Sequence, residues 1–314
     1  MIEIVDIFDS HLVKKPSALA LGLFDGVHIG HKVLLEKTVG TAKERGLLPA
    51  VFTFRSTGYK QAPTLFSRES TYRQMEEIGI KRIYEADFSR VAGYSPKDFV
   101  ETVLREICFG KILVFGDNFR FGKGAEGDAK MLKALFSLAD EQVIVVPPVK
   151  IEDKVVSSSL VREALVSGDI ESANLYLGFP YHIEGEIKRG KALGRKLQFP
   201  TINLEFSSGF AVPKRGVYVS LAEIGGKAYP GISNIGVRPT VEDTKKENCE
   251  THLLHADGDF YGQEVKVSLF SLLREEKQFE SLEALALQIQ KDTKQAKEWF
   301  SAHSEICEKF SIDN

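Results

Sequence analysis

The stretch Gly22-Leu-Phe-Asp-Gly-Val-His-Ile-Gly-His31 decides the interpretation of the first half of the chain. It follows a short apolar run, residues 16–22, that is typical of a buried strand. It precedes residues 31–45, where apolar side chains recur at helical spacing until Gly46 ends the pattern. A glycine-rich turn between a strand and a helix gathers free backbone N–H groups at the positive end of the helix dipole. The pattern therefore predicts a phosphate-binding turn at the carboxyl end of a strand.

The rest of the first half continues the alternation of strands and helices. Apolar runs without polar alternation fit strands that are buried on both faces, as in a parallel sheet. The expected strands are residues 49–54, 81–84, 111–115 and 142–147, and the expected helices are residues 67–79, 96–109 and 128–139. We therefore predict a Rossmann-like α/β domain.

Beyond about residue 182 the pattern changes to short strands separated by Gly and Pro. The expected strands are residues 181–187, 199–205, 216–224, 227–235, 249–254 and 264–272, with a turn at Asp257–Gly258. Residues 281–302 form a strongly helical stretch near the end. We predict an antiparallel β-barrel with a C-terminal helix, and we assign residues 1–180 to the first domain and 181–314 to the second.

Composition excludes several classes of protein. The chain has 314 residues and a formal net charge of −3, which gives no global basic field for nucleic acid or an anionic membrane. No apolar run approaches the roughly 20 residues that span a bilayer, and the N-terminal MIEIVDIFDS lacks the pattern of a signal peptide. The cysteines, Cys108, Cys249 and Cys307, form no CxxC pair, so we expect reduced thiols in a cytoplasmic protein. We expect a monomer or a weak homo-oligomer.

His28 and His31 lie at the mouth of the glycine-rich turn. Imidazoles can donate hydrogen bonds to phosphate oxygens there and can carry positive charge as a transition state forms. Two alternatives remain open, a metal pair and ordinary surface histidines. A metal pair needs further ligands, and the neighbouring sequence offers no cysteine or suitably spaced second carboxylate.

This turn resembles that of the H-x-G-H nucleotidylyltransferases, and its wider form resembles the prokaryotic bifunctional riboflavin kinase/FMN adenylyltransferases. Residues 114–122, VFGDNFRFG, resemble the family segment G-x-D-F-x-F-G that contacts flavin. Residues 157–162, SSSLVR, resemble the segment S-S-T-x-I-R that holds the phosphates of ATP. The resemblance implies ATP contacts at Gly22, Phe24, Asp25, Gly30, Ser157 and Ser158, catalysis by His28, His31 and Arg162, and flavin contacts at Asn118, Phe119 and Phe121.

The residues alone leave alternatives for two of these segments. Serines at positions 157–159 are also typical of a helix N-cap, and Phe119 and Phe121 fit a hydrophobic core as well as a flavin wall. The chain also departs from the family. It reads Thr53-Phe-Arg-Ser-Thr-Gly58 where the family often has T-F-x-P-H-P, and Asn118 stands in place of a common aspartate. The first departure makes a riboflavin kinase with a weak or inactive adenylyltransferase domain the main alternative.

In the second half, Thr201 and Asn203 fall on one face of an expected strand. A hydroxyl and an amide oxygen suit Mg²⁺, which takes oxygen ligands and leaves room for substrate phosphates. Residues 190–203 resemble the riboflavin kinase pattern G-R-x-x-G-F-P-T-A-N, with Gln198 and Ile202 as replacements. The basic loop before the strand can close over the phosphates of ATP through Gly190, Lys191, Gly194 and Arg195.

Downstream segments follow the order of the same family: residues 215–218, 234–240, 250–252, 259–262 and 273–275. The resemblance implies that Glu250 is the base that accepts a proton from riboflavin, with Mg²⁺ and ATP. Arg274 is expected near the flavin, with a structural ion pair as the alternative. The implied products are FMN and then FAD. A flavin-binding protein without catalysis is a further alternative, although it has no need for a base beside a magnesium site.

Overall fold

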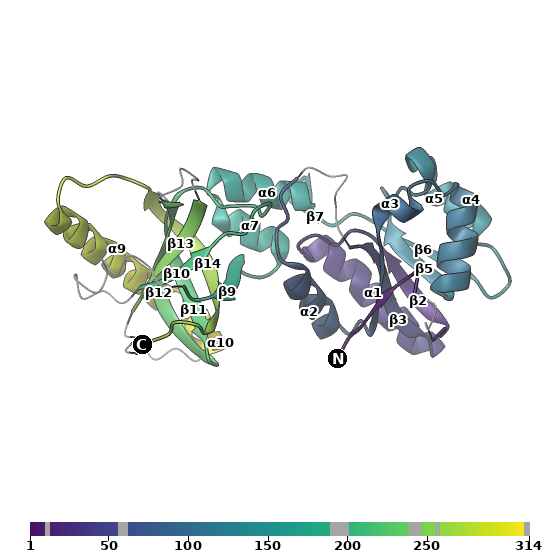
Figure 1. Ribbon diagram of the computed structural model, residues 1–314, viewed down its shortest axis with the longest axis horizontal. Coiled ribbons are helices and arrows are strands. Elements are labelled where there is room, and N and C mark those ends of the chain that lie inside the picture. Colours follow the sequence, from purple (N-terminus) through teal and green to yellow (C-terminus); the bar gives the residue numbers. More distant parts are fainter. Residues whose placement is uncertain are drawn as a thin grey trace. The chain divides into compact units, whose positions relative to one another are not determined.

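A computed structural model describes residues 1–9, 13–55, 62–188, 201–238, 246–254, 256 and 258–310. The chain forms two compact units, Met1–Ser158 and Ser159–Asn314, and each is described by itself. Figure 1 shows their helices and strands.

The first unit alternates strands with helices. Its strands are β1 (Glu3–Asp6), β2 (Ser17–Leu21), β3 (Leu48–Phe54), β4 (Arg82–Ala86), β5 (Gly110–Gly116), β6 (Gln142–Val146), β7 (Lys150–Ile151) and β8 (Lys154–Val155). Its helices are α1 (Ile29–Arg45), α2 (Arg68–Ile78), α3 (Phe88–Val91), α4 (Pro96–Asp98), the π-helix η1 (Phe99–Ile107), the 3₁₀ turn η2 (Lys123–Ala125) and α5 (Ala129–Leu135). The order agrees with the pattern predicted from sequence, with β1, β7, β8 and the short helices α3 and η2 in addition.

The large sheet of this unit is parallel and has the order β1-β4-β3-β2-β5-β6. The chain moves from β2 to β3 on one side and later returns to place β5 on the other side of β2. Ligands bind in such sheets where the strand order reverses, outside the carboxyl ends of the strands. The turn at Gly22–His31 follows β2, so it lies at this switch point. The α/β prediction is confirmed.

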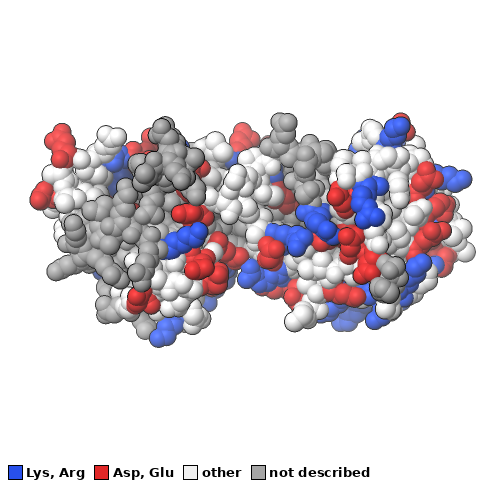
Figure 2. All heavy atoms as spheres, viewed as in Figure 1, with Lys and Arg blue, Asp and Glu red and all other residues white. Residues whose placement is uncertain are grey.

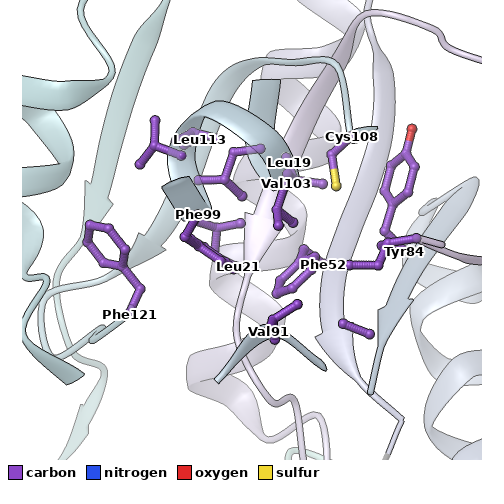
Figure 3. Close-up of a cluster of buried hydrophobic side chains, with 14 of the residues drawn as sticks. Leu19, Leu21, Phe52, Tyr84, Val91, Phe99, Val103, Cys108, Leu113 and Phe121 are labelled. Carbon is purple, nitrogen blue, oxygen red and sulfur yellow. The ribbon is translucent and has the colours of Figure 1, made fainter. Parts of the chain in front are cut away.

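Both faces of the sheet are covered. Leu19 and Leu21 of β2 belong to a cluster packed with η1, whereas Ala18 and Ala20 belong to a second cluster packed with α1 and α2. Figure 3 shows the first cluster, with Leu19, Leu21, Phe52 and Phe99 together. Neighbouring residues of one strand point to opposite faces, so these continuous apolar runs are needed to fill two cores.

Local signals set the ends of most helices. Gly46 ends α1 at a φ of 64°, in the left-handed region, as its place after the helical pattern predicted. Ser67 caps α2 by accepting a hydrogen bond from the Ser70 N–H. Helix α5 ends at Leu135, earlier than the predicted residue 139. Arg105 Nη2 donates to the Leu135 carbonyl at 2.6 Å, and Phe136 turns into the core.

The second unit begins with helices and continues with strands. Its elements are α6 (Ser158–Ser167), α7 (Ile170–Leu177), β9 (His182–Glu186), β10 (Thr201–Glu205), β11 (Gly216–Ile224), β12 (Lys227–Arg238), β13 (Lys246–Leu253), β14 (Glu264–Glu275), α9 (Leu282–Ala302) and α10 (Ser304–Phe310). Helix α7 packs on β14, where Asn174 Nδ2 donates to the Leu269 carbonyl at 2.9 Å. These helices thus lie in the second compact unit, and the functional boundary at residues 180/181 stays a prediction.

The strands of this unit form an antiparallel sheet with the order β10-β13-β12-β11-β14-β9. A bridge between Lys188 and Asn203 joins the two edges, so the sheet closes nearly into a barrel. Helix α9 packs Ala296 and Phe300 against Val217 and Val219 of β11. The predicted barrel with its terminal helix is confirmed. The turn at Asp257–Gly258 cannot be followed, since Asp257 lies outside the described residues.

Acidic and basic side chains are interspersed over the described surface in the view of Figure 2, in keeping with the small net charge. Within the described ranges, no helix is long and apolar enough to cross a membrane.

Candidate active sites

The turn after β2 has an unusual backbone. Phe24 and Val27 have positive φ values of 53° and 38°, and Gly26 has a φ of 87°. Glycine is favoured at position 26 mainly because of this left-handed conformation, and a Cβ atom there would lie 2.5 Å from Leu65 Cδ1, so the leucine side chain would also have to shift. Strain of this kind persists only where surrounding contacts hold it.

Three hydrogen bonds hold the turn. Asp25 Oδ1 accepts from the Leu65 N–H at 3.0 Å, and the Asp25 carbonyl accepts from Ser158 Oγ at 2.7 Å. Thr53 Oγ1 donates to the Leu23 carbonyl at 3.4 Å. The turn is therefore fastened to the segment before α2, to Ser158 at the end of the first unit and to the end of β3. The carboxylate of Asp25 therefore stabilises the turn. The sequence analysis predicted an ATP contact for Asp25 and not this structural role.

His28 and His31 meet at the N-terminus of α1. Their rings stack with centroids 3.7 Å apart and planes inclined by 16°, and the Phe24 ring lies 5.2 Å from that of His31. His28 is the N-cap of α1, because its Nδ1 accepts from the His31 N–H at 3.3 Å. The first turn of α1 carries no acidic residue, so the helix dipole there is not neutralised. This arrangement suits an anion.

The protonation of His28 follows from its surroundings. Burial lowers the pKa of His28 to about 4, since the charged form loses its hydration. The ring is therefore neutral at pH 7. Its Nδ1 is occupied as an acceptor, which places the proton on Nε2 as a hydrogen-bond donor.

Several other predicted contacts of the first site have visible structural roles. Phe24 is fully buried in the α1 core, and a Cβ on Gly22 would lie 3.1 Å from its ring. A Cβ on Gly30 would lie 3.2 Å from the His28 ring, so this glycine makes room for the histidine. Gly22 and Gly30 thus serve the packing of the turn in addition to their predicted contacts with ATP.

The predicted flavin-contacting residues 118, 119 and 121 differ in their burial. Phe121 is buried beside Phe99, and it appears at the edge of the cluster in Figure 3. Phe119 is half-buried and its ring stacks on that of Phe121 at a centroid distance of 5.9 Å. Asn118 is exposed. Phe121 therefore fills the core, and the contacts of all three with flavin stay predictions.

The serine segment starts helix α6. Ser158 reaches the Asp25 carbonyl, whereas Ser157 lies directly before the helix and is half-buried. Arg162 follows Ser158 by one helical turn, so the two share a face of α6. Arg162 belongs to the second compact unit, and its role at the histidines stays a prediction.

The second candidate site is a row of polar side chains across three strands. In the antiparallel register, Asn203 of β10 lies opposite Glu250 of β13, and Glu250 lies opposite Asn234 of β12. Thr201 lies opposite His252 in the same register. Directly opposed residues share a face with Cβ atoms about 5 Å apart. Thr201 and Asn203 therefore share a face, as strand alternation predicted, and Glu250 lies on the same face opposite Asn203. Asn234 joins them, and the sequence argument gave it no role.

The other face of these strands carries a buried chain of hydroxyl groups. Ser233 Oγ donates to Ser220 Oγ at 2.8 Å and lies 2.7 Å from Thr251 Oγ1. Cys249 Sγ lies 3.6 Å from Thr251 Oγ1, and burial raises the pKa of this thiol to about 11. All four side chains have no solvent exposure. This series of hydrogen-bonded hydroxyl groups links β11, β12 and β13 on the face of the sheet opposite Glu250.

Arg274 forms the ion pair that the sequence argument kept as an alternative. In the sheet register, Val217 of β11 lies opposite both Asn234 of β12 and Arg274 of β14, so these three residues share a face. Arg274 Nε and Nη2 donate to Asp292 of α9 at distances of 2.8–3.1 Å, and Asp292 is 1% exposed. Arg274 therefore ties α9 to the sheet, and its flavin contact stays a prediction.

The predicted loop residues Gly190, Lys191, Gly194 and Arg195 lie outside the described residues. No group of three or more His, Cys, Asp or Glu that could hold a metal ion occurs in the described parts of the chain. Thr201, Asn203 and Glu250 supply neighbouring oxygen donors instead, a set that suits Mg²⁺ shared with phosphates.

Comparison with known proteins identifies the family of each half of the chain. The family model for FAD synthetase matches residues 11–160, and that for riboflavin kinase matches residues 177–300. The bifunctional riboflavin kinase/FMN adenylyltransferase of Bacillus subtilis is 34% identical over 93% of this chain and 96% of its own length. The chain belongs to this family.

Other members of the family are similarly close. The Escherichia coli K12 bifunctional riboflavin kinase/FMN adenylyltransferase is 34% identical, over 90% of this chain and 92% of its own. Among solved structures, the macrolide-efflux protein from Streptococcus pneumoniae superposes with a TM-score of 0.86 at 28% identity, covering 95% of this chain and 100% of that chain. The expected family and both fold classes are thus confirmed.

Proposed function

We propose that this chain makes FAD from riboflavin in two steps. Its barrel unit transfers the γ-phosphoryl group of ATP to riboflavin, which gives FMN and ADP. Its α/β unit then transfers the AMP part of a second ATP to FMN, which gives FAD and pyrophosphate. The proposal rests on the family membership and on the match of both family models to one chain.

The observation that carries the kinase step is the register that places Glu250 opposite Asn203. Glu250 is half-buried on a strand, so it is held in place and still accessible. It would accept the proton of the terminal ribityl hydroxyl as that oxygen attacks the γ-phosphorus. Thr201 and Asn203 would hold Mg²⁺, which supplies positive charge to the phosphate oxygens.

The adenylyl step is supported by the stacked histidines at the start of α1. The FMN phosphate oxygen would attack the α-phosphorus of ATP, and pyrophosphate would leave. His28, neutral with Nε2–H as donor, and the N–H groups of the helix would bind the oxygens whose charge grows in the transition state. We extend the role to His31, Ser158 and Arg162, without a covalent enzyme intermediate.

The test is to incubate the protein with riboflavin, ATP and Mg²⁺ and to separate the flavins by chromatography over time. We expect FMN to appear first and FAD to follow. Accumulation of FMN alone would leave only the kinase, and tight binding without conversion would contradict both steps. We further propose that the enzyme is cytoplasmic and acts as a monomer or a weak homo-oligomer. Sedimentation of the same sample measures its oligomeric state.

A further inference from the structure

A cluster of charged side chains lies at the carboxyl ends of β1, β3 and β4. Glu85, the acceptor at its centre, is 3% exposed. Tyr72 of α2 donates its hydroxyl to Glu85 Oε1, and Arg68 Nη1 lies 3.5 Å from both carboxylate oxygens. Arg55, directly after β3, places Nε 3.7 Å from Glu85 Oε2 and Nη2 2.7 Å from Asp6 Oδ2.

The exposure within this cluster is the reverse of that in the Arg82–Glu3 pair, and its arginines are more exposed than Arg274, whose side chain is 20% exposed in its pair with Asp292. The Arg82 guanidinium, in the same sheet, is 2% exposed and is held by Glu3, Tyr84 and a backbone carbonyl, while its partner Glu3 is 53% exposed. In the cluster the Glu85 side chain is only 4% exposed, whereas the side chains of Arg55 and Arg68 are 47% and 44% exposed. Glu85 therefore anchors two guanidinium groups that still face solvent.

The cluster adjoins the turn that follows β2. Arg68 begins α2 shortly after Leu65, whose N–H donates to the Asp25 carboxylate at 3.0 Å. Arg55 comes shortly after Thr53, whose hydroxyl donates to the Leu23 carbonyl at 3.4 Å. In addition, β3 is the direct neighbour of β2 in the parallel sheet. Both arginines are thus connected to the phosphate-binding turn by short, hydrogen-bonded segments.

We propose that Arg68, with Arg55 beside it, binds a phosphate group of a substrate of the adenylyl transfer step. A guanidinium group has several N–H donors in one plane, so it can keep Glu85 on one edge and hold phosphate oxygens on another. Asp6 and Glu85 face the two positive charges at rest, Glu69 Oε1 lies a further 3.8 Å from Arg68 Nε, and Asp6 is itself 37% exposed. In the sequence, Arg55 directly precedes residues 56–58, Ser-Thr-Gly, where the family often has Pro-His-Pro.

The proposal rests on the proposed function of the first unit, and it leaves two sources for the phosphate, FMN and ATP. The experiment compares Arg68→Met and Arg55→Met with Arg73→Met, an exposed arginine on the same helix as a matched control. For each variant, KM for FMN and KM for ATP are measured separately in the adenylyl step. Riboflavin phosphorylation by the same chain shows that the protein is intact.

We expect Arg68→Met to raise one of the two KM values roughly 10- to 100-fold, the loss typical of a charge-assisted hydrogen bond, and the affected substrate identifies the phosphate. Arg55→Met should raise the same KM by a smaller factor, Arg68→Lys should restore part of the effect, and Arg73→Met should change neither value. Tyr72→Phe, which removes a partner of Glu85 and keeps both arginines, should lower the melting temperature with KM within about threefold.

Unchanged KM values in Arg68→Met and Arg68→Lys, with only a lower melting temperature, would overturn the proposal. Binding of FMN and of ATP, followed by flavin fluorescence and calorimetry without turnover, separates this result from failure of the proposed function. Loss of affinity in Arg68→Met supports the phosphate contact even if the wild type makes no FAD. Equal affinities in wild type and variant contradict it.

Discussion

The turn after β2 and the strand pair β10–β13 position their functional side chains in different ways. In the turn, positive φ values at Phe24, Gly26 and Val27 shape the backbone, and hydrogen bonds from distant segments hold it. In the barrel, ordinary strand geometry and register place Asn203 opposite Glu250. The comparison teaches that the first site depends on particular backbone conformations, whereas the second depends on which residues face each other across a sheet.

The largest effect is expected at the base of the barrel site. Glu250→Gln keeps the size and the hydrogen bonding of the side chain but removes its ability to accept a proton. We expect riboflavin phosphorylation to fall by about 10²–10⁴-fold, with FAD formation from added FMN unchanged. Glu264→Gln, at the exposed start of β14, is the control. A kinase rate close to that of wild type would show that Glu250 is not the base.

A pH effect is expected for the turn after β2. Because the pKa of folded His28 is about 4 and that of an unfolded histidine about 6.5, the unfolded state binds the extra proton between these values. The free energy of unfolding of the first unit should therefore fall by up to about 3 kcal/mol as pH drops from 6.5 to 4, and should not change through His28 above pH 6.5.

The wild type is compared with His28→Asn, a variant that keeps a side chain able to cap α1 and removes the titrating group. Urea unfolding of the first unit is monitored by hydrogen exchange of peptides from β2 and β3. The free energy of unfolding should fall less in acid for the variant than for the wild type. The same acid dependence in both proteins would mean that His28 is not held neutral by burial.

A smaller effect tests the backbone of the turn. Gly26→Ala adds a Cβ in the left-handed region and brings it against Leu65. We expect about 2 kcal/mol of destabilisation in the first unit and slower adenylyl transfer, with the kinase rate unchanged. Gly40→Ala, inside α1 with open space around it, should instead stabilise by about 0.5–1 kcal/mol. Equal effects of the two substitutions on FAD formation would contradict the account of the turn.

The smallest effect tests the support behind the barrel row. Thr251→Val removes the hydroxyl that contacts Ser233 and leaves a buried polar group without this partner. We expect a loss of about 1–2 kcal/mol in the second unit and a several-fold lower kinase kcat, with KM nearly unchanged. Thr251→Ser should restore most of the stability and most of the kinase kcat. Fluorescence of Trp299, the single tryptophan, reports this unit because it packs on Phe270 of the barrel. A stable variant with full kcat would exclude a supporting role.

Much of this organisation follows from local pattern. Buried runs such as residues 49–54 predicted strands, Gly46 predicted a helix end, and strand alternation predicted that Thr201 and Asn203 share a face. What local pattern does not contain is contact between distant segments. The Asp25–Leu65 hydrogen bond, the opposition of Asn234 to Glu250, and the Arg68–Glu85 anchor each join different elements. The sequence signal for Asn234 was its place in a family segment, and its spatial role needed the register.

The most direct test of the central claim, that one chain carries two separate catalytic sites, is a mixing experiment with His31→Ala and Glu250→Gln. Each variant is incubated with riboflavin, ATP and Mg²⁺, alone and then together, and FAD is measured by chromatography. The account predicts that His31→Ala stops at FMN, that Glu250→Gln leaves riboflavin unchanged, and that the mixture forms FAD. Failure of the mixture to form FAD, or formation of FAD by either variant alone at the wild-type rate, would contradict it.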